Sequence, residues 1–573
     1  MTNKSEEKIS DSVEILDGVS STDVNDKVAA VFQEYLPEEH VLSEVDYIAK
    51  ENNLESYREL LNRGALWANN PKIIETDEYA VSERRAFERS RTHPMLSLSP
   101  HMKLAAICTS CAAINFGMDE SAIGGAVLQY QTQFNITDAN IQGLTVAAPY
   151  LAAAIIGAPL TLYLDKYMGR KWIILLSCVI GFAGSLIQGF SNGLGCLLFA
   201  RLFLGIGMGL NSSTVPIYTA ECSPAHSRGA VLMLWQTFIA LGVCLGSVFN
   251  RAFVGISGSL SWRLMIGSSA VAPFITGILI FFPPESPRWL IVNGRARESL
   301  DALIKLRPND LTGARDFYIL HQSLKFEAEL KNPLSSWQQF KSLFGNARNR
   351  FAIIVSFIGI LGQQYGGVNI LVSYTTTILT KAGVDPVTAI AGSIGIGGGC
   401  FLATFLSTQL IDRYGRRKML LFTLPVEAIC LFWLGGVLNV QNTQSRLGAG
   451  LASMYVFVLF YGTGIGPVSF TLVAETSSIS VRMAHSATCM FVNWILDFCL
   501  SMTWPKMNAT MTTSGGLYFY GAFNILIWAL AYFCIPETKQ FTLEQLDEIF
   551  KVGILAHIKK TSRYLTTWKG RHK

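Results

Sequence analysis

Asp119 and Glu120 stand side by side in a long apolar stretch, INFGMDESAIGGAVL, which covers residues 114 to 128. An ionised side chain at membrane depth costs roughly 2.5 to 3.5 kcal/mol on insertion scales, so it usually has a partner or faces a water-filled path. On a helix the two side chains point about 100° apart and cannot share one partner in regular geometry. The pair therefore predicts a site whose partners come from elsewhere in the chain.

The elements that must position these residues are membrane-spanning helices. Hydrophobic residues make up 50% of the chain and charged residues 15%, which excludes an ordinary soluble globular protein. Apolar segments of roughly 20 residues, each long enough to cross the bilayer, recur from about residue 104 onward, and we expect about twelve. They begin near Leu104, Ile141, Trp172, Leu194, Gly229, Trp262, Phe351, Val387, Met419, Leu447, Ser486 and Ser514.

Charged loop motifs repeat in the two halves of the chain at a separation of about 250 residues. The repeat predicts two parallel six-helix halves, with a substrate site near the bilayer midplane and alternating access by rocking. The matching pairs are LDKYMGRK (164–171) with IDRYGRRK (411–418), Glu221 and Arg228 with Glu475 and Arg482, and PESPRW (284–289) with PETKQF (536–541).

The acids and bases of these motifs can pair in one conformational state and separate in another. We interpret them as a cytoplasmic gating network, since acidic partners accompany the bases at fixed spacing. The alternative is that the basic residues anchor the loops at the membrane surface. The candidate residues are Arg170, Glu221, Arg228, Glu285, Arg288, Asp412, Arg416, Glu475 and Arg482.

The distribution of Lys and Arg predicts that both termini and the long central loop face the cytoplasm. The sequons at Asn135 and Asn508 fall in loops assigned to the outside, so both asparagines are glycosylation candidates. Helix-like patches near the N-terminus would lie on the membrane or against the cytoplasmic loops. The expected domains are a cytoplasmic tail (1–103), a six-helix half (104–283), a cytoplasmic linker with short helices (284–350), a second six-helix half (351–535) and a cytoplasmic tail (536–573).

Over roughly residues 104 to 550 the chain resembles the sugar porter family of the major facilitator superfamily, and its longer Tyr-Met-Gly-Arg-Lys loop is similar to that of fungal-type members. The resemblance implies an all-α membrane protein of twelve helices that moves a sugar, polyol or cyclitol such as inositol. The motifs that carry it are ARLFLGIGMG, PIYTAECSPAHSRG, PESPRW, QQYGGVN, DRYGRRK, GPVSFTLVAE and PETK.

The family's substrate site maps onto amide and aromatic residues, which recognise neutral polyols without charge. Ser373-Tyr374 and Cys400 depart from the residues common in relatives, which puts glucose itself in doubt as the substrate. The residues implied by the resemblance are Gln236, Gln363, Gln364, Asn369, Phe470, Asn493 and Trp494.

The resemblance also implies a role for Asp119, because proton-coupled relatives keep this acid close to the arginine matched by Arg201. Protonation of Asp119 would release Arg201 and change the relative energies of the outward and inward states. A structural ion pair in an uncoupled facilitator is the alternative. Glu120 has three open roles: a hydrogen bond to substrate, a second proton site, or a contact with a water-filled vestibule.

No phosphate-binding loop, metal-spaced cluster or nucleophile motif stands out in the sequence, so we expect neither an enzyme nor an ATP-driven pump. We expect no cofactor or metal, with protons as the coupling ion. The expected partners are the small-molecule substrate and the lipid bilayer, with no nucleic acid, for a monomer in the plasma membrane. The rival from another class is a sugar receptor that signals without transport, because the N-terminal tail is long.

Overall fold

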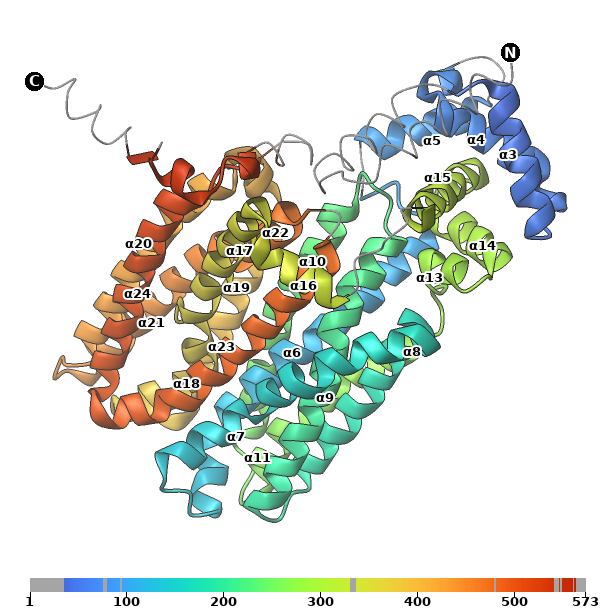
Figure 1. Ribbon diagram of the computed structural model, residues 1–573. Coiled ribbons are helices and arrows are strands. Elements are labelled where there is room, and N and C mark those ends of the chain that lie inside the picture. The colour runs from blue at the N-terminus through green and yellow to red at the C-terminus, as the bar shows by residue number, and fades with distance from the viewer. Residues whose placement is uncertain are drawn as a thin grey trace, which may run out of the picture.

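The computed structural model describes residues 36–75, 80–92, 95–329, 336–478, 481–539, 546, 549–559 and 561–562. Regular structure within these residues is entirely helical, which confirms the predicted all-α class. Figure 1 shows two bundles of long helices side by side, with shorter helices gathered at one end of the molecule.

The N-terminal bundle begins where Ser99 caps α6 by accepting the backbone N–H of Met102 at 3.1 Å, with Pro100 in the first turn. The chain reverses inside the segment assigned to α8 at Gly169, whose φ of +75° favours glycine. The helices are α6 (Pro100–Gln133), α7 (Ala139–Ala152), η3 (Ala153–Gly157), α8 (Ala158–Gly189), α9 (Leu194–Cys222), α10 (Arg228–Phe253), α11 (Leu260–Gly267), η4 (Ser268–Ala270) and α12 (Val271–Leu279).

The C-terminal bundle repeats this plan, and Gly415 with φ of +92° occupies the turn that corresponds to Gly169. A second glycine, Gly367, has φ of +103° and interrupts the first long helix of this bundle. The helices are α17 (Ala347–Tyr365), α18 (Val368–Lys381), α19 (Pro386–Tyr414), α20 (Arg416–Val437), α21 (Thr443–Thr463), α22 (Ile465–Thr476), α23 (Arg482–Thr510) and α24 (Thr512–Cys534).

Ten helices of the described chain are long and apolar enough to cross a membrane. One of them, Ala139–Gly189, is 51 residues long and contains the reversal at Gly169, so it accounts for two crossings. Helix α6, which carries Asp119 and Glu120, is not among the ten but is long enough to span. The helices thus agree with the expected twelve crossings.

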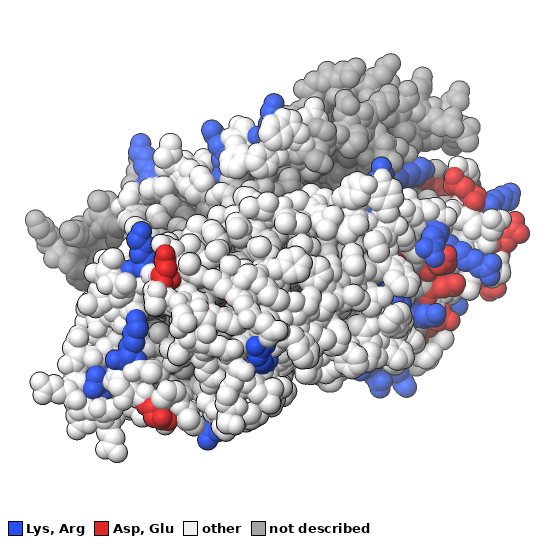
Figure 2. Space-filling model, turned by 90° about the horizontal axis from the view of Figure 1, so that it is seen from below, with Lys and Arg blue, Asp and Glu red and all other residues white. Residues whose placement is uncertain are grey.

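The outer surface of the bundles is apolar. Figure 2 shows uncharged residues over most of the middle of the molecule, with charged residues toward its edges. Large apolar side chains such as Leu162, Phe190 and Phe422 are more than half exposed. Continuous exposed apolar surface of this kind fits a lipid environment and marks a multi-pass membrane protein.

The two bundles touch along the helix pairs α6–α18, α7–α23 and α10–α19. At each of these contacts the backbones lie so close that only glycine fits, and at the α10–α19 pair a Cβ on Gly397 would stand 2.5 Å from the backbone of Cys244. A Cβ on Gly124 would stand 2.8 Å from the carbonyl oxygen of Ser373, and one on Gly143 would stand 2.4 Å from that of Met502. Small residues allow this close approach between membrane helices.

A separate helical unit forms from the N-terminal segment and the linker, at the same end of the molecule (Figure 1). Val45, Leu61, Leu300 and Phe317 are among the buried residues of its shared core. The segment therefore packs against the linker, one of the two placements expected for it. The helices of the unit are α3 (Glu38–Glu51), η1 (Glu55–Tyr57), α4 (Arg58–Asn69), η2 (Pro71–Glu75), α5 (Val81–Thr92), α13 (Pro287–Val292), α14 (Ala296–Leu306) and α15 (Asp310–Glu329). The next helix, α16 (Ser336–Gly345), instead contacts α17 and α23 of the C-terminal bundle.

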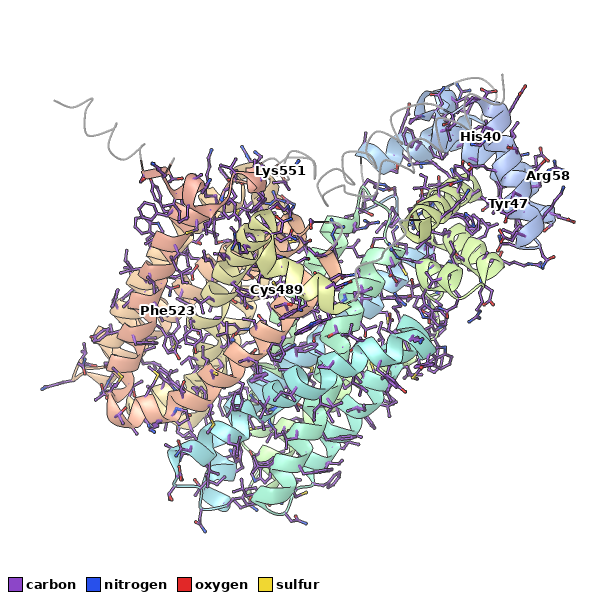
Figure 3. The ribbon with its side chains drawn as sticks, viewed as in Figure 1. His40, Tyr47, Arg58, Cys489, Phe523 and Lys551 are labelled. Carbon is purple, nitrogen blue, oxygen red and sulfur yellow. The ribbon has the colours of Figure 1, made fainter. Side chains whose placement is uncertain are left out.

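Polar contacts fasten this unit together and to the N-terminal bundle. The hydroxyl of Tyr57 donates to Asp301 at 3.0 Å, and Arg307 donates to the carbonyl oxygen of Cys222, the last residue of α9, at 2.7 Å. His40, Tyr47 and Arg58 lie on the side of the unit away from the bundles (Figure 3).

Candidate functional site

A chain of amide hydrogen bonds links three helices of the C-terminal bundle. Gln364 on α17 donates to Asn493 on α23 at 2.9 Å. Asn369 on α18 donates to the side-chain oxygen of Gln364 and, at 3.1 Å, to Asp497 on α23. The break at Gly367 separates α17 from α18, and it allows Gln364 and Asn369 to meet although they are five residues apart. The structure thus brings three predicted residues together.

Asp497 is a member of this cluster that the sequence interpretation missed. It lies one helical turn after Asn493 and is only 7% exposed. The available signal was the one that singled out Asp119, namely an acidic residue inside an apolar segment.

Trp494 connects the two bundles beside the amide cluster. Its ring stacks on Phe116 of α6, with centroids 5.7 Å apart, and on Tyr150 of α7, with centroids 5.9 Å apart. Its indole N–H donates to Ser212 of α9 at 3.2 Å. The predicted aromatic residue therefore lies at the boundary between the halves, where it can form an apolar wall.

Two of the remaining predicted substrate contacts, Gln236 and Gln363, have side-chain oxygens that accept no hydrogen bond within the described structure. Gln236 on α10 and Gln363 on α17 are 9% and 8% exposed, and in the described structure the side-chain oxygen of each is buried without a hydrogen-bond partner. Buried polar atoms are normally paired, so these two acceptors are available for a ligand that donates. Phe470 lies on α22 and is half-buried.

The structure brings Asp119 and Arg201 into direct contact. One guanidinium nitrogen of Arg201 lies 3.0 and 2.8 Å from the two oxygens of Asp119, and both side chains are almost completely buried. Gln188 donates to the same carboxylate at 3.3 Å. The other guanidinium nitrogens donate to the carbonyl oxygens of Thr145 and Val146. Such extra hydrogen bonds offset the desolvation cost of a buried ion pair.

Glu120 lies on a different face of α6 from Asp119. The charges that act on it most strongly are those of Asp497 and Asp119, and both are negative. Its Oε1 atom is buried and has no hydrogen-bond partner among the described residues.

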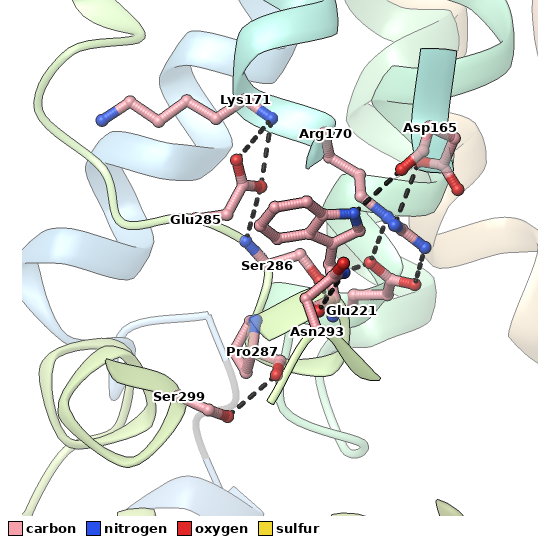
Figure 4. A network of polar contacts seen from close by, with 10 residues as sticks. Asp165, Arg170, Lys171, Glu221, Glu285, Ser286, Pro287, Asn293 and Ser299 are labelled. Carbon is pink, nitrogen blue, oxygen red and sulfur yellow. Dashed lines mark hydrogen bonds and ion pairs between the residues drawn. The ribbon is translucent and has the colours of Figure 1, made fainter. Parts of the chain in front are cut away.

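At the other end of the N-terminal bundle, Figure 4 shows a network of charged residues. Arg170 forms ion pairs with Asp165 and Glu221, each at 3.0 Å, and Ser286 also donates to Glu221. Glu285 accepts the backbone N–H groups of Lys171 at 3.1 Å and Ser286 at 2.8 Å. Burial raises the pKa of Glu285, while these N–H groups and Arg170 act to lower that pKa.

The C-terminal bundle repeats the network. Arg416 pairs with Glu475 at 2.7 Å, and Thr538 donates to Glu475 at the same distance. Glu537 accepts the backbone N–H of Arg416 at 2.9 Å, beside the turn at Gly415. Each of these bonds joins residues of the same half of the protein, so each network can move together with its own bundle.

The other residues predicted for the gating network lie at or near the ends of helices. Arg228 and Arg482 begin α10 and α23, and Arg288 lies in α13. Arg228 is placed beside the charges of Arg307 and Asp316, whereas Glu221 is held by Arg170 and Ser286. Asp412 lies near the end of α19, and its side chain is outside the described residues.

The two sequons differ in setting. Asn135 is exposed in the turn between α6 and α7, as expected for a loop residue. Asn508 was expected in a loop but lies in the last turn of α23, where it accepts a hydrogen bond from Thr513 at 2.6 Å. The helix continues through Pro505, so the loop expectation for Asn508 was wrong.

A family model described as "Sugar (and other) transporter" matches residues 105–550 of the chain. The probable polyol transporter 6 of Arabidopsis thaliana is 28% identical over 466 residues, covering 78% of this chain and 93% of that protein. The galactose-proton symporter of Escherichia coli strain K12 is 27% identical over 444 residues, covering 77% of this chain and 93% of that protein.

Among solved structures, the xylose transporter of E. coli in a partially occluded inward-open conformation superimposes with a TM-score of 0.66 at 23% identity. The match covers 78% of this chain and 100% of that one, which shows the major facilitator fold. Because the family model spans most of the chain, and the predicted two-bundle fold is observed, the chain belongs to the sugar porter family of the major facilitator superfamily.

Proposed function

We propose that this protein is a secondary active transporter that moves a sugar, polyol or cyclitol across a membrane by alternating access, with proton symport. The observation that carries the proposal is the chain of hydrogen-bonded amides formed by Gln364, Asn369 and Asn493, of which Gln364 and Asn493 are buried. It lies next to Trp494, at the boundary between two six-helix bundles.

The chemistry of this region fits a neutral ligand with many hydroxyl groups. Amides both donate and accept without carrying charge, and they suit hydroxyls that do the same. The unpartnered oxygens of Gln236 and Gln363 would accept hydrogen bonds from such a ligand. Trp494 and Phe470 would cover its apolar C–H faces.

Proton coupling is supported by two observations. Relatives of the chain include a galactose-proton symporter and an arabinose-proton symporter. In addition, Asp119 forms an ion pair with Arg201 inside the N-terminal bundle, which in this proposal rocks relative to the C-terminal bundle. Protonation of Asp119 would release Arg201 and so change the relative stability of the two states.

The charged networks serve in this proposal as cytoplasmic gates, one in each half. In this topology both termini and the linker lie in the cytoplasm, and the protein acts as a monomer in the plasma membrane. The ion pairs of Arg170 with Glu221 and of Arg416 with Glu475 are then the contacts that rearrange when the bundles close.

The test is uptake of labelled hexoses, pentoses, inositol and linear polyols by cells that lack their own transporters, with and without a protonophore. We expect one substrate to accumulate, and both the protonophore and Asp119→Asn to abolish its accumulation. Asp385→Asn is the matched control, because Asp385 is an exposed N-cap and asparagine caps equally well. This control is expected to accumulate substrate like the wild type.

Other outcomes would contradict parts of the proposal. Uptake that only equilibrates and ignores the protonophore would make the protein a facilitator, in which Asp119 is a structural partner of Arg201. Binding without uptake, despite normal surface expression, would make it a receptor.

A further inference from the structure

Glu120 and Asp497 are two carboxyl groups placed beside a contact between the two halves. Glu120 follows Phe116 by four residues and Asp497 follows Trp494 by three, and the rings of Phe116 and Trp494 stack with centroids 5.7 Å apart. Glu120 comes from α6 in the N-terminal bundle and Asp497 from α23 in the C-terminal bundle. Asp497 exerts the largest electrostatic effect of any charged group on Glu120. Neither residue forms an ion pair within the described parts of the chain, which distinguishes them from Asp119.

Among the described residues, the charged groups that act on Glu120 or Asp497 include no lysine, arginine or histidine. The other ionisable groups that interact electrostatically with Glu120 are Asp119 on its own helix, Tyr150 on α7, Cys400 on α19 and Tyr461 on α21. Arg201 on α9 is engaged by Asp119 and by two backbone carbonyls. A buried carboxylate in such surroundings gains free energy by binding either a proton or a cation.

Glu120 and two of the predicted substrate contacts have hydrogen-bond acceptors without a partner in the described structure. Glu120, Gln236 and Gln363 each hold a buried oxygen without a partner in the described structure, and both glutamines are more than nine-tenths buried. A protonated carboxyl supplies an O–H donor, which the ionised form lacks. The unpartnered acceptors are therefore an independent sign that the region takes up a ligand that donates.

We propose that Glu120 and Asp497 form a second proton-binding site, in which the two halves share one proton when they close around the substrate. The proposal rests on the proposed transport function and concerns a site separate from Asp119. Two carboxylates that approach each other cannot both stay ionised at low cost, so closure favours uptake of one proton. When the halves separate, the repulsion falls and the proton is released to water.

Asn369 supplies the link between this proton and the substrate. It donates at once to Asp497 and to Gln364, which belongs to the predicted substrate site. Protonation of Asp497 weakens its bond to Asn369 and frees that amide for a substrate hydroxyl. Proton binding and substrate binding then both depend on the side-chain amide of Asn369. This shared dependence gives a coupling free energy between the two binding events.

The test uses the full-length protein in proteoliposomes, with Glu120→Gln and Asp497→Asn as variants that mimic a fixed neutral carboxyl. We expect the number of protons moved per substrate to fall by one, and net accumulation to fall about tenfold, within the usual range of coupling free energies. Equilibrium exchange of substrate needs no net proton movement, so each variant should lose more in net accumulation than in exchange. The control is again Asp385→Asn.

A second measurement does not depend on transport. Infrared difference spectra of the purified protein between acidic and alkaline pH should show a protonated carboxyl band that is lost in both variants. An unchanged band together with an unchanged proton count would overturn the proposal. Preferred uptake of a cationic amino sugar, lost in Glu120→Gln with the proton count unchanged, would also overturn it, since the pair would then bind substrate. Wild-type protein that transports nothing would instead contradict the proposed function, and the infrared band would still decide this inference.

Discussion

At the scale of single residues, the buried ion pair of Asp119 and Arg201 is the most constrained polar contact near the candidate site. Arg201 uses three guanidinium nitrogens, two of them on backbone carbonyls, so its position is fixed by α7 as well as by Asp119. Removal of one partner of a buried pair leaves the other charge uncompensated, which costs more than the pair itself contributes.

We therefore predict that Arg201→Ala lowers the free energy of unfolding by about 3 to 5 kcal/mol. The thermal midpoint of the purified protein, followed by intrinsic fluorescence, measures this effect. The double variant Asp119→Asn with Arg201→Gln removes both charges and should recover part of the loss. If the double variant is no more stable than Arg201→Ala, the loss does not come from the stranded charge.

At the scale of elements, the break between α17 and α18 positions the amide cluster. An unbroken helix would place Gln364 and Asn369 on different faces, since five residues correspond to about 500° of rotation. Gly367 makes the break with a left-handed backbone conformation, and a Cβ there would also stand 3.2 Å from Leu431. The geometry of the site thus depends on one glycine.

Gly367→Ala is expected to destabilise the protein by about 1 to 3 kcal/mol and to reduce substrate affinity, because the strain shifts Asn369. Thermal midpoint and equilibrium binding of the transported substrate measure the two effects. Gly448→Ala is the control, since Gly448 lies in α21 with open space around its Cβ position. Equal behaviour of the two variants would show that the break tolerates a side chain.

At the scale of the whole molecule, the N-terminal helical unit is attached to only one of the two bundles by the contacts described above. Its core joins α3 and α4 to α14 and α15, and Arg307 ties the linker to the end of α9. Movement of the N-terminal bundle would therefore carry this unit along.

Phe317→Ala should loosen this unit without unfolding the bundles. Loss of a fully buried ring costs about 3 to 5 kcal/mol, which is large for a small core. We expect limited proteolysis to cleave the segment 36–92 faster while substrate binding is retained. Tyr47→Ala serves as control because Tyr47 is 64% exposed. Cleavage at the same rate in both variants would mean that the core does not hold the segment.

The sequence by itself determined the features that depend on local order. Apolar length predicted the crossings, because a helix must satisfy its own backbone in lipid. The repeated motifs predicted two equivalent halves, and the resemblance to the sugar porter family implied a polar region between them that includes residues 119, 201, 236, 363, 364, 369, 493 and 494.

Only the tertiary structure decided which distant residues meet. The contact of Trp494 with Phe116 and Tyr150 and the docking of the N-terminal segment on the linker both join positions hundreds of residues apart. Helical periodicity shows that a face is apolar or polar but does not show which helix covers it. That choice depends on packing between helices, where close backbone contacts such as Gly124 against Ser373 set the register.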